Sequence, residues 1–240
     1  MDGICGTLAG LARAQPDHAA LVPPGGRQPL TFRALESRVR ERAGDLAASG
    51  IGPGDRVVVA GAISIELYVW LLALWWRGAT AVFLDPWMGR AGLESALAST
   101  RPKAVVLPGI LRPLLALWAP VRRVPRVWSL GRRPRSGPDL PHHPAEADHP
   151  SLITFTTGSS GQPKGAVRTH GNLMAQHGLL ARELGDGPED VALATLPVFA
   201  LHHLAAGAAV VLPGRHRLAG DPKAARAAAL QVVRERVTMI

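Results

Sequence analysis

A loop built almost entirely of glycine, hydroxyl side chains and one lysine separates two short apolar runs in the middle of the chain. The runs cover residues 152–155 and 166–169, and their β-branched content predicts two strands. Glycine lets the backbone approach a ligand closely, so amide N–H groups and hydroxyls can converge on phosphate oxygens, while a lysine adds positive charge. We therefore predict a phosphate-binding loop whose contacts are Thr156, Thr157, Gly158, Ser159, Ser160, Gly161 and Lys164.

The order of residues in this loop excludes a Walker A motif. That motif has four residues between its first glycine and a Gly-Lys-Ser/Thr ending, with a helix directly after it. Here the loop ends in Pro163-Lys164-Gly165. An ordinary Gly/Ser turn is the alternative, but a plain turn does not require so many hydroxyls together with a lysine. The string from Leu152 to Leu173 instead resembles the signature loop of the adenylate-forming enzymes, which include acyl-CoA synthetases, peptide-synthetase adenylation domains and luciferases.

Two upstream segments support this resemblance. Residues 30–35 resemble the family's Leu-Thr-Tyr-x-x-Leu segment, and residues 76–86 resemble its Lys-x-Gly-Ala-x-x-Val-Pro-Leu-Asp-Pro segment. Both segments also fit structural roles, because Thr31 can cap a helix and residues 80–84 can form a buried strand. The core-facing side of that helix would consist of Leu35, Val39 and Leu46. We interpret both segments as scaffold rather than as chemistry.

The resemblance implies ATP-dependent activation of a carboxylic acid. In that chemistry the substrate carboxylate attacks the α-phosphorus of ATP and gives an acyl-adenylate and pyrophosphate. The loop from Thr156 to Lys164 would hold the β- and γ-phosphates, and magnesium would offset their charge. ATP and Mg2+ are therefore the expected cofactors, and no catalytic residue or protein metal ligand is assigned within this chain.

A further segment bears on the substrate. Residues 196–203 resemble the family's Leu-Pro-x-Phe-His run, which lies near the carboxylate and acyl pocket, but Ala200 stands where many members have histidine. Together with residues 84–90, this run is more similar to the branch that handles long-chain acyl or β-hydroxy acids, including the olefin β-lactone synthetases, than to amino-acid adenylation domains. The expected substrate is a fatty or β-hydroxy acid. Phe199 fits a core aromatic equally well.

The family's later segments do not occur in these 240 residues. They are an aromatic-Gly-x-Thr-Glu run, a Thr-Gly-Asp run and a lysine on a C-terminal domain. We expect the chain to be the N-terminal part of the adenylate-forming fold, truncated, and not to be competent alone. Two alternatives stay open: a non-catalytic remnant or nucleotide-binding or regulatory module, and one chain of a split enzyme whose partner chain carries the C-terminal part.

Strand-type and helix-type segments alternate along the chain, which predicts an α/β fold of layered, mostly parallel sheets with helices on both faces. Helices are expected at 32–49, 64–76, 90–99 and 172–184, and buried strands at 57–59, 82–84, 105–107 and 210–212. The stretch 131–150 is rich in Pro, Gly, Arg and His. It is the expected linker between a first α/β subdomain, 1–130, and an incomplete second subdomain, 151–240, that begins with the phosphate loop.

Composition limits the partners and the compartment. The formal net charge is +9, and basic residues concentrate between 122 and 135. This region matches no nucleic-acid module, so we expect no nucleic-acid partner and interpret it as a solvated surface, with peripheral contact to anionic membrane as the rival. The most apolar window, Leu67 to Trp76, is too short to span a bilayer, which takes about 20 residues. A single cysteine, Cys5, and no export signal predict a cytoplasmic location.

Histidines suggest no metal site at this level. His142, His143 and His149 lie in a proline-rich stretch, and a His202-His203 pair lies in an apolar segment. No pair has a zinc-site spacing supported by a cysteine or a second cluster. A further histidine, at position 170, follows the phosphate loop, where a core or positioning role is expected.

Overall fold

The computed structural model describes residues 3–25, 27–84, 89–111, 113, 117–157, 163–194, 196–214 and 222–240. These residues form two compact units. The first unit combines Met1–Cys5, Val39–Ala62 and Glu66–Leu173, and the second combines Gly6–Arg38, Ile63–Ile65 and Met174–Ile240.

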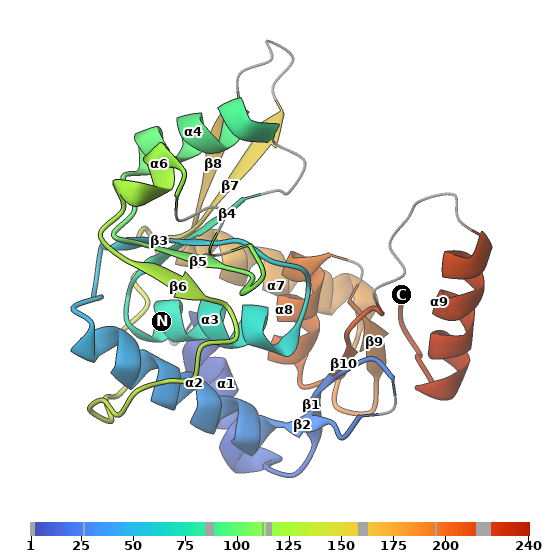
Figure 1. Ribbon diagram of the computed structural model, residues 1–240. Coiled ribbons are helices and arrows are strands. Elements are labelled where there is room, and N and C mark those ends of the chain that lie inside the picture. Colours follow the sequence, from blue (N-terminus) through green and yellow to red (C-terminus); the bar gives the residue numbers. More distant parts are fainter. Residues whose placement is uncertain are drawn as a thin grey trace. The chain divides into compact units, whose positions relative to one another are not determined.

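Helices and strands alternate along the chain, as Figure 1 shows. The helices are α1 (Gly3–Ala14), α2 (Phe32–Ala48), α3 (Ile65–Trp76), α4 (Gly89–Thr100), α6 (Ala119–Arg122), α7 (His170–Leu184), α8 (Pro197–Ala206) and α9 (Pro222–Arg234). The strands are β1 (Ala19–Val22), β2 (Leu30–Thr31), β3 (Arg56–Val59), β4 (Thr80–Phe83), β5 (Ala104–Leu107), β6 (Val127–Ser129), β7 (Pro150–Thr157), β8 (Pro163–Thr169), β9 (Val191–Leu193) and β10 (Ala209–Val211). All four predicted helices and all four predicted strands are confirmed within a few residues.

The first unit is organised around a six-stranded sheet in the order β6-β5-β3-β4-β7-β8. Every neighbouring pair is parallel except β7 and β8, which form an antiparallel hairpin. The predicted, mostly parallel α/β fold is therefore confirmed. Parallel strands align their carboxyl ends along one edge of a sheet, and in open α/β folds ligands bind outside that edge.

Helices cover both faces of this sheet. Successive side chains of a strand point to opposite faces, and the three consecutive valines of β3 are all 0% exposed, so neither face is open to water there. On one face Val58 packs in a cluster with Leu97 of α4 and Val121 of α6. Figure 1 shows α3 on the opposite face, where its residues from Leu67 to Trp76 are buried. Because helices cover both faces, the sequences of the central strands are mostly apolar and do not alternate between apolar and polar residues.

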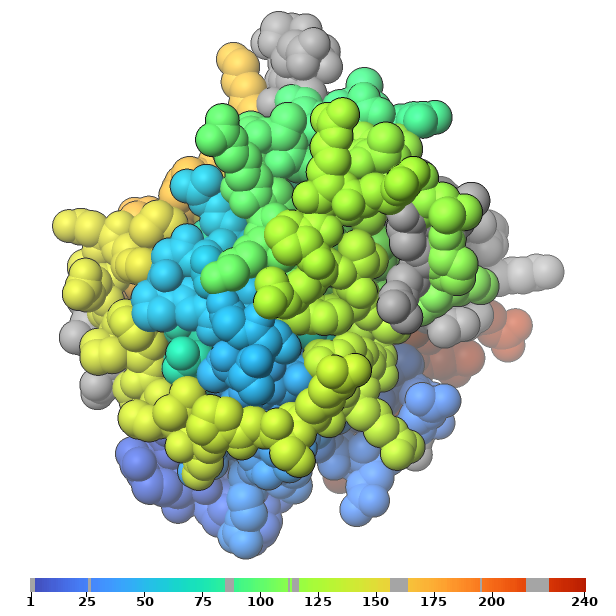
Figure 2. All heavy atoms as spheres, turned by 60° about the vertical axis from the view of Figure 1, so that its left-hand side comes forward, coloured from blue at the N-terminus to red at the C-terminus, as the bar shows by residue number. Residues whose placement is uncertain are grey.

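Three indoles of α3 donate hydrogen bonds to carbonyls in the proline-rich stretch 131–150 and directly on either side of it. Trp70 donates its indole N–H to the carbonyl of Leu130, and Trp76 donates to that of Leu140, at 2.8 and 2.9 Å. Trp75 donates to the carbonyl of Ser151 in β7 at 2.7 Å. Residues 131–150 therefore lie along the surface of the first unit (yellow-green to yellow in Figure 2).

A backbone crossing fixes the same stretch against α2. A Cβ atom on Gly137 would lie 2.1 Å from the carbonyl oxygen of Gly44, and one on Gly44 would lie 2.6 Å from that of Pro138. Only glycine fits at so close an approach. The expected division at 131–150 does not coincide with the boundary between the two compact units, because these contacts hold the stretch within the first unit.

The second unit contains a four-stranded sheet in the order β2-β1-β10-β9. β1 pairs in parallel with β10, with Leu21 opposite Val210, so two distant parts of the chain share one sheet. Residues 237–240 follow α9 and lie next to β9. The structure places only one parallel bridge there, between Met239 and Ala192, because few backbone groups of this segment reach β9.

Local signals explain several helix ends. The backbone N–H of Ala34 donates to Oγ1 of Thr31 at 3.3 Å, which caps the start of α2 as expected. Gly50 and Gly185 have φ values of 74° and 64°, so they end α2 and α7 in the left-handed conformation that favours glycine. Within the part of the chain described, no helix combines the length and apolarity required to cross a membrane.

Candidate functional site

The predicted phosphate loop connects the two strands of the β7–β8 hairpin. Thr156 lies opposite Lys164, and Thr157 lies opposite Pro163, so the last described pairs stand at the base of the loop. The Lys164 side chain is exposed. The two strands expected on either side of the loop are therefore confirmed. Residues 158–162, which include Gly158, Ser159, Ser160 and Gly161, lie outside the described residues.

The hairpin extends past its neighbour at the carboxyl edge of the sheet. β4 pairs with β7 only as far as Phe83 opposite Thr154. Among the described residues, the next positions of β7, from Phe155 to Thr157, pair only with β8. The loop therefore follows the edge at which parallel α/β sheets bind ligands.

Side chains below the loop hold the hairpin in register. A Cβ atom on Gly165 would lie 3.2 Å from the ring of Phe155 directly opposite, so the ring covers this glycine. Arg168 donates to Oγ1 of Thr154 at 2.9 Å, and Ser151 Oγ donates to the carbonyl of Arg168 at 2.9 Å. These cross-strand contacts make the hairpin a fixed support for a loop.

His170 follows the hairpin as the first residue of α7 and is buried. Its backbone N–H donates to the carbonyl of His149, and its ring meets the edge of Trp75 at 6.1 Å between centroids. Burial, reinforced by repulsion from His149 and His143, lowers the pKa of His170 to about 4. The side chain is therefore neutral at physiological pH and fits the expected core role.

The arginine-rich region forms part of a polar groove in the first unit. The groove has a volume of about 700 Å³ and is lined by Ser49, Arg126, Val127, Trp128, Ser129, Arg132, Arg133 and Arg135. Arg132 is partly committed to structure, since it pairs with the buried carboxylate of Asp45 and lies over the ring of Trp128. The other arginines that line the groove are Arg126, Arg133 and Arg135.

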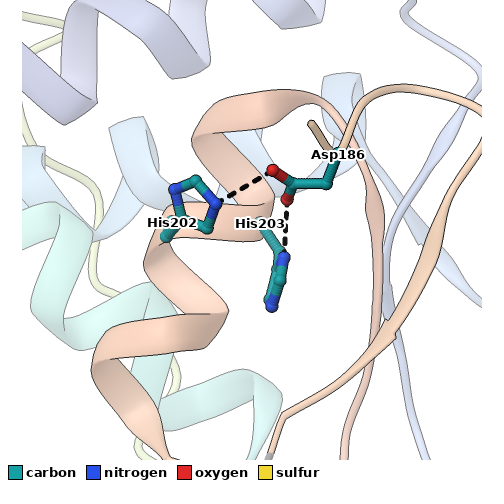
Figure 3. Close-up of side chains that lie close together, drawn as sticks. All are labelled: Asp186, His202 and His203. Carbon is teal, nitrogen blue, oxygen red and sulfur yellow. Dashed lines mark hydrogen bonds and ion pairs between the residues drawn. The ribbon is translucent and has the colours of Figure 1, made fainter. Parts of the chain in front are cut away.

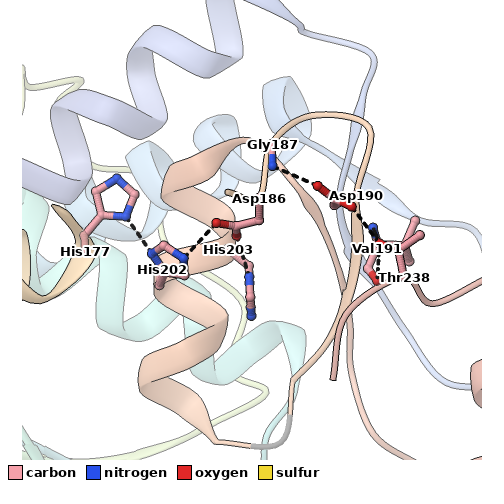
Figure 4. A network of polar contacts seen from close by, with 8 residues as sticks. All are labelled: His177, Asp186, Gly187, Asp190, Val191, His202, His203 and Thr238. Carbon is pink, nitrogen blue, oxygen red and sulfur yellow. Dashed lines mark hydrogen bonds and ion pairs between the residues drawn. The ribbon is translucent and has the colours of Figure 1, made fainter. Parts of the chain in front are cut away.

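A second set of polar groups lies inside the second unit and is buried. Oδ1 of Asp186 is 2.9 Å from Nε2 of His202, and Oδ2 is 2.6 Å from Nδ1 of His203 (Figure 3). Nδ1 of His177 in α7 lies 2.8 Å from Nδ1 of His202 (Figure 4). Burial lowers the pKa of His202, although Asp186 opposes the shift, and burial likewise lowers the pKa of His177.

Sequence reasoning did not find this cluster. The pair at positions 202 and 203 was noted, but Asp186 was not considered as its partner. The signal that was available is that the segment after α7 contains an acidic residue a short distance before an apolar segment with two histidines. Only the fold shows that the carboxylate faces both rings.

The comparisons with known proteins agree with the fold. The family described as AMP-binding enzyme matches residues 9–240. An olefin β-lactone synthetase from Xanthomonas campestris is 34% identical over 233 residues, which cover 88% of this chain and 42% of the relative. A feruloyl-CoA synthase from an Amycolatopsis species is 34% identical over 238 residues, which cover 95% of this chain and 46% of the relative. The chain therefore spans less than half the length of these relatives.

Solved structures give the same result. The AMPPNP-bound form of the nonribosomal peptide synthetase FmoA3 matches with a TM-score of 0.82 at 27% identity, over 98% of this chain and 25% of that one. The N-terminal domain of FACL13 from Mycobacterium tuberculosis matches with a TM-score of 0.84 at 23% identity, over 99% of this chain and 62% of that one, and supports the fold alone. With a family match across almost its whole length and a fold that agrees, the chain belongs to the AMP-binding enzymes.

Proposed function

We propose that this chain provides the ATP-phosphate-binding part of a ligase that activates a carboxylic acid as an acyl-adenylate. The observation that carries the proposal is the β7–β8 hairpin, which holds Thr156 opposite an exposed Lys164 at the base of a loop rich in glycine and hydroxyls. Backbone amides, hydroxyls and one ammonium group are suitable donors for phosphate oxygens. ATP and Mg2+ are the proposed cofactors.

The loop acts by holding charge in position. The residues proposed to contact the β- and γ-phosphates are Thr156, Thr157, Gly158, Ser159, Ser160, Gly161 and Lys164. These donors would stabilise the pyrophosphate as it leaves the α-phosphorus. Magnesium, when bound to the nucleotide, offsets phosphate charge during the displacement.

We propose a fatty or β-hydroxy acid as the substrate. Support comes from the relative named olefin β-lactone synthetase and from residues 196–203, which include most of α8. Ala200 on this helix is buried, and Phe199 is half-buried. We also propose that the protein is cytoplasmic and that a partner chain carries the remaining segments. A peripheral contact between the arginine groove and anionic membrane is a further proposal.

Exchange of labelled pyrophosphate into ATP tests the proposal. The assay compares fatty, β-hydroxy and amino acids, with the chain alone and with the chain mixed with the remaining segments of a relative. We expect exchange that depends on a fatty or β-hydroxy acid in the mixture, and a loss of at least about tenfold in Lys164→Ala but not in Arg122→Ala, an exposed site on α6.

Other results would redirect the proposal. Exchange with amino acids only would overturn the proposed substrate class. No exchange in either arm, with nucleotide binding retained, would instead identify a nucleotide-binding module without catalysis. Exchange with the chain alone would contradict the expectation that further segments are required.

A further inference from the structure

We propose that Asp186, His202 and His203 bind a zinc ion inside the second unit. The phosphate-binding role proposed above does not involve these three side chains. The turn after α7 presents the carboxylate, and two neighbouring positions of α8 present the imidazoles (Figure 3). One ligand atom from each residue lies within 4.8 Å of the others.

The charge of the cluster favours a cation. The side chain of Asp186 is 0% exposed, and those of His202 and His203 are 2% and 6% exposed. Within the described part of the chain, the ion pairs of this carboxylate are those with the two imidazoles. Burying a carboxylate is costly unless a positive charge compensates it, and a bound divalent ion provides that charge.

The spacing of the ligand atoms is close to what a metal requires. Two ligand atoms on one zinc ion, each roughly 2.0–2.2 Å from it, lie about 3–3.5 Å apart. The carboxylate oxygens of Asp186 lie at hydrogen-bond distance, 2.9 Å from Nε2 of His202 and 2.6 Å from Nδ1 of His203. Binding an ion would therefore require each pair to move apart by less than about 1 Å. A ligand set of imidazole nitrogen and carboxylate oxygen suits zinc, whereas Mg2+ and Ca2+ prefer oxygen alone.

A third histidine, His177, supports one of the ligands. In a zinc complex His202 would bind through Nε2 and carry its proton on Nδ1, which faces Nδ1 of His177 at 2.8 Å. His177 would then accept that hydrogen bond and carry its own proton on Nε2. His203 would bind through Nδ1 and carry its proton on Nε2. A partner on the distal nitrogen of a ligating imidazole fixes the ring and its tautomer.

The elements that carry the ligands are held at both ends. Gly185, in the left-handed conformation, turns the chain directly before Asp186, and Gly187 donates its N–H to Asp190 at 3.0 Å. Helix α8 ends at Gly207, whose N–H bonds to the last carbonyls of the helix. The ion would clamp this turn to α8, so we assign it a structural role.

Titration of the metal-free protein with Co2+ and Zn2+ tests the site. We expect one Co2+ per chain with visible d–d absorption, and loss of those bands when Zn2+ is added. His202→Gln and His203→Asn are the informative variants, because each amide N–H2 replaces the N–H that faces Asp186 while the metal ligand is lost. We expect each to weaken binding at least about tenfold, and His177→Gln to weaken it less.

The double variant His142→Gln/His143→Gln is the matched control, since it removes two histidines of the first unit. Its affinity should be unchanged. Zinc X-ray absorption of the wild type, which does not depend on any variant folding, should show two imidazoles and carboxylate oxygen. Absence of the d–d bands, equal affinity in the ligand variants, loss only in the control, or an oxygen-only zinc shell would each overturn the proposal.

Discussion

The β7–β8 hairpin and the Asp186 cluster both gather polar groups, but they differ in exposure. Lys164 at the base of the hairpin loop is exposed, whereas the side chain of Asp186 is 0% exposed. An exposed charge contributes little to folding and is free to meet a ligand, while a buried charge must be compensated within the protein. We therefore expect changes at the hairpin to affect binding and changes at buried carboxylates to affect stability.

The largest loss of stability is expected at a buried carboxylate in the first unit. Asp45 is 1% exposed and pairs with Arg42, which is 2% exposed, and with Arg132. Asp45→Ala would leave a permanently charged guanidinium buried without its partner, so we expect a loss of about 3–5 kcal/mol in the free energy of unfolding, measured with urea. Asp139→Ala, which breaks the exposed pair with Arg40, is the control and should cost less than about 1 kcal/mol. Equal losses would contradict the role of burial.

The same change in the second unit should cost less. Asp186→Ala in metal-free protein removes the acceptor of two imidazoles that can both remain neutral, so we expect a loss of about 1–3 kcal/mol in the free energy of unfolding. A loss as large as that of Asp45→Ala would show that the imidazoles are charged. Chemical denaturation of the two variants under identical conditions makes the comparison.

His170 makes the first unit sensitive to acid. Its pKa is lowered from 6.5 to about 4 by burial and by His149 and His143. The unfolded state therefore binds the proton first as pH falls below about 6.5, and stability decreases until pH reaches about 4. After allowance for solvent screening, we expect a decrease of about 1–2 kcal/mol.

His170→Phe should make the free energy of unfolding less dependent on pH across this window, since the phenyl ring does not titrate. His18→Phe, at a histidine of the second unit, is a suitable comparison. An unchanged pH profile in His170→Phe would show that another group causes the acid sensitivity.

The smallest effect on folding is expected at the hairpin. Lys164→Ala removes an exposed side chain, so the free energy of unfolding should change by less than about 0.5 kcal/mol. Thermal or urea unfolding without nucleotide measures this. A larger loss would mean that Lys164 has a structural partner. The contrast between an exposed hairpin and a buried Asp186 cluster would then not hold.

The sequence predicted the helices and strands whose signals lie in neighbouring residues. It did not predict the contacts between residues that are distant in the sequence. The hairpin was predicted because its two apolar runs flank one loop, and α3 was predicted because the residues from Leu67 to Trp76 form the most apolar window of the sequence. β1 was missed because two of its four residues are alanine, which gives a weak strand signal, and its parallel partner, β10, is distant in the sequence.

The candidate sites follow the same rule. The phosphate-loop residues are close together in the sequence, so a single segment was enough to predict that they bind phosphate. Two other contacts join segments that are distant in the sequence. Gly44 crosses Gly137, and Asp186 contacts His202, and the spacing of these residues in the sequence does not predict that they meet.

Calorimetric titration of the chain with ATP–Mg tests the central claim most directly. We expect the wild type and Arg122→Ala to bind equally, and Lys164→Ala to bind roughly tenfold to a hundredfold more weakly, because one charge-assisted contact to phosphate is lost. Equal affinity of the wild type and Lys164→Ala would contradict the assignment of the hairpin loop as the nucleotide site.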